Sequence, residues 1–295
     1  MLKKQRYPFI LSGLSDEAGP SIDIQIQAHL ELGWREMEIR SLNGKPLYKI
    51  DNSTFKQIKS KLDNADFSIT TVASCIGNWE RPINMPFEQD LEELKILSER
   101  MHKLGTKYVR IMSYPNNGLS EDDWFKYVVE RMHVLTEFAY SSNIVLLHEN
   151  CSGWGGVSPQ NTLHLLEIIN NPALRLLFDI GNGIAYNYDS YEFLQKVYKY
   201  VDHVHVKDGL IQNQEVIYTL PGEGQSKVKK CLQFLLQNGY TGILSIEPHL
   251  HLIPHLKKNG KLNDLKESYI NYGRHLETLL ETLSPIDGEV KILHE

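Results

Sequence analysis

The chain has 295 residues, of which 41% are hydrophobic and 23% are charged, and its formal net charge at pH 7 is −6. These proportions are typical of a soluble globular protein. The acidic balance argues against a nucleic-acid partner, because nucleic-acid-binding domains usually present a basic patch or stripe. No run approaches the roughly 18 consecutive apolar residues that would indicate a membrane-spanning helix.

Short β-rich segments alternate along the chain with longer segments of helical periodicity. In the longer segments apolar residues recur at three- and four-residue steps, as at Leu91, Leu94 and Leu97, which is the pattern of one buried helix face. Several of these segments end in glycine, as at Gly33 and Gly105, which is a common stop signal for a helix. The predicted strands, in chain order, are Tyr7–Leu14, Trp34–Arg40, Phe67–Ser74, Lys107–Ser113, Asn143–Glu149, Leu174–Ile180, Asp202–Lys207 and Gly242–Glu247.

The alternation of strands and helices predicts an α/β fold with a parallel sheet, because right-handed βαβ units build such sheets. Eight repeats in a chain of this length predict a single-domain (β/α)₈ TIM barrel over residues 1–295. The competing fold is a doubly wound open sheet. The first predicted strand is followed by LSDEAGPS, which lacks a glycine-rich phosphate fingerprint, and no linker divides the chain. The barrel is therefore favoured.

The seventh predicted strand contains the sequence HVHVKDG, in which polar and apolar residues alternate from residue 203 onward. Strands of a TIM barrel are buried on both faces, one against the helices and one toward the interior. If the valines face the helices, then His203, His205 and Lys207 face the interior. A buried lysine or histidine is costly unless it is paired or binds a metal. The alternation therefore predicts partners for these side chains inside the barrel.

The last four predicted strands each bring one possible metal ligand to the C-terminal rim, where TIM-barrel enzymes build their active sites. These ligands are Glu149 in LLHEN, Asp179 in LLFDIGN, His205 in HVHVKD and Glu247 in LSIEPH. Each carboxylate alone could instead pair with a loop cation or cap a helix. Together they form an oxygen-rich set with one imidazole, which suits Mn²⁺, Mg²⁺, Co²⁺ or Zn²⁺. We predict one divalent metal ion.

Several motifs resemble those of the xylose-isomerase-like TIM barrels, the sugar phosphate isomerase/epimerase group. They are HEN, FDIGN, HVHVKD, PGEG and GYTGILSIEPH, with LSDEAG and EIRSLNGKPL near the start, so the resemblance spans nearly the whole chain. It implies that Glu149, Asp179, His205 and Glu247 are the metal ligands. It also implies that Glu149 and Glu247 are the acid/base pair, on opposite sides of a carbohydrate substrate.

The resemblance implies an isomerase or epimerase that moves a proton next to the carbonyl of a sugar or sugar phosphate through an enediolate. The chain departs from the ketose epimerases at Asn182, where they usually have a histidine. An amide does not replace an imidazole that accepts a proton, so a dehydratase of a keto-inositol or related keto-sugar is the alternative. A non-catalytic sugar-binding barrel is a further alternative. A nuclease is disfavoured, because the rim offers few histidines.

Five further residues are candidates for substrate binding. Lys207 could contact a substrate oxygen or only neutralise Asp179. A tryptophan in a loop after a strand could form an aromatic wall for a sugar or could be plain packing, and both Trp154 and Trp79 lie in such loops. Asp208 is expected to orient Lys207 or to cap a loop. The candidates are Lys207, Asn182, His249, Trp154 and Glu38.

The chain shows no sign of secretion. Its three cysteines, Cys75, Cys151 and Cys231, are far apart and form no CxxC pair, which fits a reducing compartment. The first residues have a basic head, but the apolar run that follows is short and has no small-residue cleavage site. We expect a cytoplasmic enzyme with a small-molecule carbohydrate substrate and no membrane partner. A homo-oligomer remains open.

Overall fold

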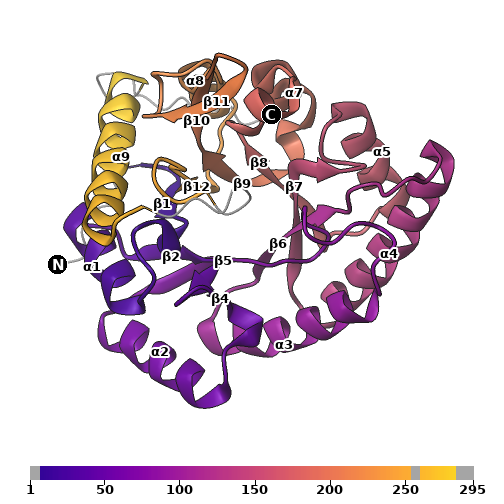
Figure 1. Cartoon of the computed structure of the whole chain (residues 1–295), viewed down its shortest axis with the longest axis horizontal. Coiled ribbons are helices and arrows are strands. Elements are labelled where there is room, and N and C mark those ends of the chain that lie inside the picture. The colour runs from indigo at the N-terminus through magenta and orange to yellow at the C-terminus, as the bar shows by residue number, and fades with distance from the viewer. Residues whose placement is uncertain (1–6, 254–259, 284–295) are drawn as a thin grey trace.

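Eight parallel strands form one sheet in the computed structural model, which describes residues 7–253 and 260–283. A single parallel bridge between Leu14 and Glu38 joins the two outer strands, so the sheet curves into a nearly closed barrel (Figure 1). The predicted TIM barrel is confirmed, and each predicted strand overlaps an observed one. In sheet order the strands are β1 Ile10–Gly13, β12 Ile243–Ile246, β9 Val201–Val206, β8 Leu174–Asp179, β7 Val145–Gly153, β6 Tyr108–Ser113, β5 Ser68–Ala73 and β2 Glu36–Ile39.

Helices surround the strands on the outside of the barrel (Figure 1). Their ends follow the local sequence signals. Ser120 caps the first turn of α4 (Glu121–Ser141) by accepting from the backbone N–H of Asp123. Gly33 and Gly105 end α1 (Ile22–Leu32) and α3 (Glu88–Leu104), each with a φ of 76°. The helices are α1 Ile22–Leu32, α2 Asn52–Asn64, α3 Glu88–Leu104, α4 Glu121–Ser141, α5 Pro159–Ile169, α6 Asn182–Tyr186, α7 Ser190–Val197, α8 Val228–Gln237 and α9 Leu262–Leu283, with short 3₁₀ turns at Ser15–Glu17, Leu47–Lys49 and Tyr198–Tyr200.

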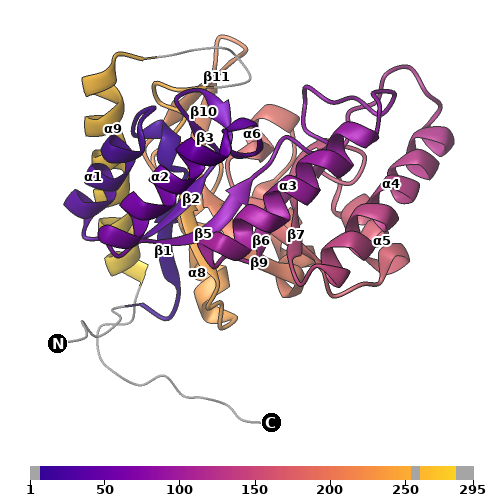
Figure 2. The same cartoon turned by 90° about the horizontal axis from the view of Figure 1, so that it is seen from below.

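Two small hairpins project from the rim, and the sequence analysis did not predict them. One pairs β3 Ser41–Leu42 with β4 Lys45–Pro46, and the other pairs β10 Asp208–Gln212 with β11 Glu215–Thr219. In Figure 2 both hairpins lie at the same end of the barrel as α6. The turn between β10 and β11 consists of Asn213 and Gln214, both with positive φ, which is the backbone that a tight hairpin requires.

The apolar core lies between the strands and the helices. Val204 and Val206 are fully buried in this core. His203, His205 and Lys207 are buried as well, but they form polar contacts. The prediction for the HVHVKDG strand is therefore confirmed: its polar side faces inward.

Among the described helices, no segment is long and apolar enough to cross a bilayer.

Candidate active site

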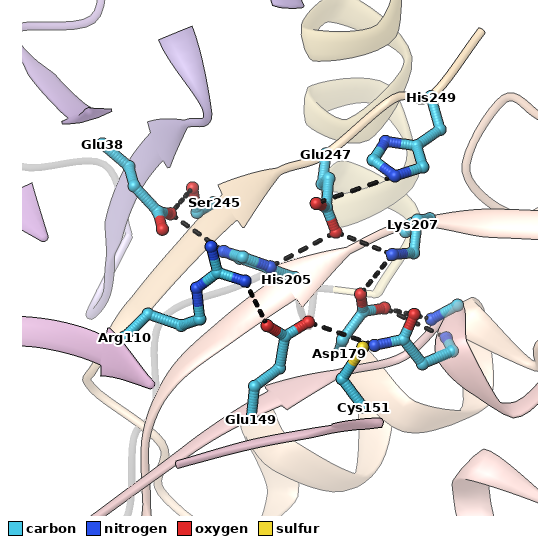
Figure 3. A network of polar contacts seen from close by, with 12 residues as sticks. Glu38, Arg110, Glu149, Cys151, Asp179, His205, Lys207, Ser245, Glu247 and His249 are labelled. Atoms are coloured by element: carbon cyan, nitrogen blue, oxygen red, sulfur yellow. Dashed lines mark hydrogen bonds and ion pairs between the residues drawn. The ribbon is translucent and has the colours of Figure 1, made fainter. Parts of the chain in front are cut away.

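The four predicted metal ligands meet at the C-terminal ends of four neighbouring strands, β7, β8, β9 and β12. One ligand atom from each of them lies within 4.8 Å of the others, and all four side chains are buried. In Figure 3, Glu247 approaches this cluster from above and Glu149 from below. The parallel register explains the convergence, because Asp179 is level with His205, and His205 with Ser245, two residues before Glu247. We call Glu149, Asp179, His205 and Glu247 the rim cluster.

Two buried cations hold the carboxylates of the rim cluster together. Lys207 Nζ lies 2.5 Å from Asp179 Oδ2 and 2.7 Å from Glu247 Oε2. Arg110 Nη1 donates to Glu149 Oε2 at 2.9 Å, and the side-chain amide of Asn182 donates to Glu149 Oε1 at 3.1 Å. The second Asp179 oxygen accepts from backbone N–H groups at the start of α6. These donors fix the orientation of each of the three carboxylates.

These pairings shift the pKa values of the buried groups. Burial raises the pKa of Asp179, and the positive charge of Lys207 offsets part of that rise. Burial also opposes ionisation of Glu247, but the charges of Lys207 and its neighbouring histidines hold the pKa of this carboxyl well below its usual range. Burial disfavours the Lys207 ammonium as well, yet Asp179 and Glu247 hold its pKa well above the usual value. Lys207 is therefore charged at neutral pH.

A second buried group lies beneath the rim cluster and fixes the ring of His205. Glu38 Oε2 accepts from Ser245 at 2.8 Å and lies 2.9 Å from His205 Nε2. Burial opposes protonation of His205, but Glu38 and Glu247 outweigh it and raise its pKa well above the usual value. His203 Nε2 lies 3.1 Å from the same Glu38 oxygen, two residues further from the rim. The contact with Glu38 turns His205 Nδ1 toward the carboxylates of the rim cluster, 3.3 Å from Glu247 Oε2.

The rim cluster fits a divalent ion by its donor set. It offers three carboxylates and one imidazole, which are the ligands that Mn²⁺, Mg²⁺, Co²⁺ and Zn²⁺ take in proteins. His205 Nδ1 is buried and forms no well-aligned hydrogen bond with any described residue, whereas Asp179 Oδ2 pairs with the Lys207 ammonium. A buried polar atom without an aligned partner, such as His205 Nδ1, calls for a ligand or an ion. The contact between His205 Nε2 and a carboxylate is also the usual support of a metal-bound imidazole.

A cavity of about 250 Å³ lies next to the rim cluster, and Glu149 and Glu247 form part of its wall. Three of the residues predicted to bind substrate, Lys207, Asn182 and His249, line it. The backbone N–H and the ring of His249 both contact Glu17, so this side chain is held in place at the cavity wall. Glu38 does not line the cavity. It is fully buried below His205 and supports that ring instead.

Trp154 also lies away from the cavity. Its indole N–H donates to Glu121 at 2.6 Å, and its ring lies 4.5 Å from that of Phe125 on α4. Trp154 therefore packs between α4 and α5, since its ring also lies 6.0 Å from that of His164 on α5. The tryptophan that lines the cavity is Trp79, in the loop after β5. Both loops follow strand ends, so sequence position alone did not separate them.

The sequence analysis did not identify several cavity residues. Arg110 stands inside a buried strand, and a charge flanked by apolar residues in YVRIMS was a signal for it. Arg40 directly follows β2 and pairs with Asp16 and Glu247. No sequence pattern pointed to the remaining wall residues, Met112, Cys151, Ala185, Tyr186 and Tyr218.

Comparison with known proteins agrees with this fold. A family model described as xylose isomerase-like TIM barrel matches residues 26–266. An inosose dehydratase of Clostridium botulinum (strain Eklund 17B / Type B) is 21% identical over 191 residues, which cover 55% of this chain and 64% of the relative. The matched stretch thus spans less than two thirds of that relative's length.

Two solved structures share the fold. The 3-keto-D-glucoside 4-epimerase from E. coli aligns with a TM-score of 0.69 at 16% identity, over 91% of this chain and 99% of the other. A xylose isomerase-like TIM barrel protein from Mycobacterium smegmatis, in complex with magnesium, aligns with a TM-score of 0.66 at 15% identity, over 95% of this chain and all (100%) of the other.

Proposed function

Because the chain belongs to the xylose isomerase-like TIM barrel family, we propose that it is a metal-dependent enzyme that moves a proton next to the carbonyl group of a polyhydroxy substrate. The observation that carries the proposal is the rim cluster, in which two glutamates approach from opposite sides next to a small cavity. We infer isomerisation or epimerisation of a sugar as the reaction. A purely sugar-binding barrel would not need both glutamates.

Glu149, Asp179, His205 and Glu247 would hold one divalent ion. The donor set supports this assignment, and so does His205 Nδ1, which faces the carboxylates without an aligned hydrogen bond. One similar structure contains magnesium. When bound, the ion would polarise the substrate carbonyl and stabilise the negative charge that develops on its oxygen.

The two glutamates would share the proton transfer. One carboxylate takes the proton from the C–H group next to the carbonyl, which leaves an enediolate. Return of a proton to the opposite face by the other glutamate gives the epimer, and return to the adjacent carbon gives the isomer. Arg110 and Asn182 each donate to one oxygen of Glu149 and so fix its orientation. Glu247 is oriented in the same way by Lys207.

Dehydration is the second candidate, and the position of Lys207 favours it. Its ammonium group lines the cavity beside Glu247 and is held charged by Asp179 and Glu247. A charged ammonium at this place would donate a proton to a leaving hydroxide after a glutamate has taken the proton next to the carbonyl. The similarity to an inosose dehydratase also favours dehydration, and so does the amide at Asn182, where ketose epimerases usually have a histidine. Both candidate reactions share their first step.

The test is metal analysis of the purified protein, followed by incubation in D₂O with a panel of ketoses and inososes. Solvent deuterium entering the carbon next to the carbonyl without loss of water indicates an isomerase or epimerase. An unsaturated product indicates the dehydratase. If metal binds at the rim cluster but no compound in the panel exchanges or reacts, the enzymatic proposal fails and the sugar-binding barrel takes its place.

A further inference from the structure

Three cations line the cavity, and each is already paired with carboxylates of the chain. Arg40 Nε lies 3.0 Å from Asp16 Oδ2, and its Nη2 lies 3.4 Å from Glu17 Oε1. Arg110 and Lys207 pair with the carboxylates of the rim cluster. A phosphate or carboxylate on a substrate would bring its own negative charge next to these carboxylates and would compete with them for the same cations. Taking the partner away from a buried carboxylate is strongly unfavourable.

TIM barrels often bind phosphate in the loops after the seventh and eighth strands, which here follow β9 and β12. In the loop after β9, the chain itself occupies backbone N–H groups that could serve this purpose. Directly after β9, the fully buried Asp208 accepts from four backbone N–H groups, at distances of 2.8 to 3.1 Å. Gathered loop N–H groups are typical phosphate donors, but here the Asp208 carboxylate takes them. The donors are Gly209, Gly222, Gly224 and Ser226.

Much of the remaining cavity wall is apolar or aromatic. Trp79, Met112, Tyr186 and Tyr218 contribute to it. Aromatic faces of this kind pack well against the C–H face of a polyol. The volume of about 250 Å³ lies at the small end of small-molecule sites and suits one compound of monosaccharide size.

We propose that this site selects an uncharged polyhydroxy ketone and discriminates against its phosphorylated and carboxylated analogues. The inference rests on the proposed function and narrows its substrate class. Hydroxyl groups suit the available partners, because carboxylate oxygens accept from them and the third N–H of Lys207, beyond the two that face Asp179 and Glu247, donates to them. None of these contacts requires an unpaired cation.

The experiment measures how charge on the probe affects binding to the full-length protein loaded with Mn²⁺. scyllo-Inosose and D-fructose are compared with D-fructose 6-phosphate and 5-keto-D-gluconate by titration calorimetry and thermal shift, at a fixed excess of free Mn²⁺. We expect the uncharged compounds to bind roughly tenfold or more tightly than the anions. Equal or tighter binding of either anion would overturn the proposal.

Solvent-deuterium exchange on the same samples separates this inference from the proposed function. If D-fructose 6-phosphate binds preferentially and exchanges, the selection for uncharged substrates is refuted while the enzymatic function stands. If the uncharged compounds bind preferentially but none exchanges, the selection is supported and the enzymatic function fails. If no probe binds, both fail.

A matched pair of variants tests the role of Asp208. Asp208→Asn removes the negative charge that accepts from the four loop N–H groups. Asp202→Asn is the control, because it removes a charge near the opposite end of β9, where Asp202 pairs with Arg175. We expect Asp208→Asn to raise the affinity for D-fructose 6-phosphate relative to D-fructose by roughly five- to tenfold, the effect of one nearby unit charge, and Asp202→Asn to leave the ratio unchanged. An unchanged ratio of the two affinities in folded Asp208→Asn would refute this role of Asp208. If the variant does not fold, the ratio of the two affinities in the unaltered protein tests the proposed selection for uncharged substrates.

Discussion

The two halves of the barrel contribute different chemistry to the site. The last four strands, β7, β8, β9 and β12, supply the whole rim cluster. The first four strands and their loops supply cations and apolar wall, namely Arg40, Trp79, Arg110 and Met112. The cations of the first half pair with glutamates of the second half, Arg110 with Glu149 and Arg40 with Glu247. The second half therefore provides the groups to which we assign metal binding and proton transfer, and the first half provides cations that pair with its two glutamates and part of the cavity wall.

The largest expected effect comes from the glutamates of the second half. Glu149→Gln and Glu247→Gln each keep the size of the side chain and one possible ligand oxygen but remove the basic carboxylate. Metal affinity should fall only partly, whereas turnover should fall by the ~10²–10⁴-fold typical of a deleted general acid or base. Metal content and steady-state rates, measured with metal in excess, check this result. Glu223→Gln, at an exposed loop position, is the control.

Solvent exchange distinguishes the two glutamates from each other. For an epimerase, the variant that lacks the proton-abstracting glutamate should lose deuterium exchange. The other glutamate variant should retain exchange without inverting the configuration of the carbon. For a dehydratase, one variant should retain proton abstraction while product formation fails. Full activity in both variants would show that neither glutamate takes part in catalysis.

The next effect tests the charge balance supplied by the first half. Arg110→Met leaves Glu149 buried without its cation. The free energy of unfolding of the metal-free protein should fall by about 3–5 kcal/mol, as for other buried pairs that lose one partner. Saturating Mn²⁺ should restore part of this loss, because a bound cation would take over the charge of Glu149. Urea denaturation with and without Mn²⁺ measures both values, and an equal loss in the two conditions would contradict the role assigned to Arg110.

The sequence predicted the second half of the site better than the first half for a physical reason. Glu149, Asp179 and Glu247 stand at the ends of β-rich runs, and all parallel strands of a barrel end at one rim. His205 follows from the period-two alternation of a strand buried on both faces. Strand positions were therefore enough to bring these residues together without knowledge of any long-range contact.

The rest of the site depends on contacts that the local sequence does not encode. Arg110 is visible as a charge in a buried strand, but its partner, Glu149, lies on another strand and is set by the register between β6 and β7. The β10–β11 hairpin was hidden in a segment interpreted as a loop, so Tyr218 was not expected at the cavity. Asp208 was expected to orient Lys207 or cap a loop, and its four backbone donors show that it holds the loop.

Acid should destabilise both halves through buried neutral histidines. Burial lowers the pKa of His148 on β7 and of His29 on α1 from 6.5 to about 4. Each is neutral in the fold but takes a proton on unfolding below pH 6.5, so its contribution is complete above that pH. The contribution is lost as the pH falls toward 4, at a cost of about 3 kcal/mol for each histidine.

Replacing one of these histidines should remove its share of the acid sensitivity. His148→Leu should reduce the fall in unfolding free energy between pH 6.5 and 4 by about 3 kcal/mol, and the share of His29 should remain. Urea denaturation at several pH values in this range measures the slope of the unfolding free energy against pH. A slope identical to that of the unaltered protein would show that His148 is protonated in the fold.

The smallest effect compares one tryptophan from each half. Trp79, after β5, lines the cavity, whereas Trp154, after β7, packs against Phe125 and donates to Glu121. Trp79→Ala removes an aromatic face from the substrate and should raise KM roughly tenfold, which corresponds to about 1.4 kcal/mol, with little change in unfolding free energy. Trp154→Ala should leave KM unchanged and lower the unfolding free energy by about 3–5 kcal/mol, because it opens a cavity between α4 and α5. Steady-state kinetics and urea denaturation of both variants separate the two roles. If Trp154→Ala raised KM while Trp79→Ala did not, the aromatic wall would belong to the second half, and the division of labour between the halves would fail.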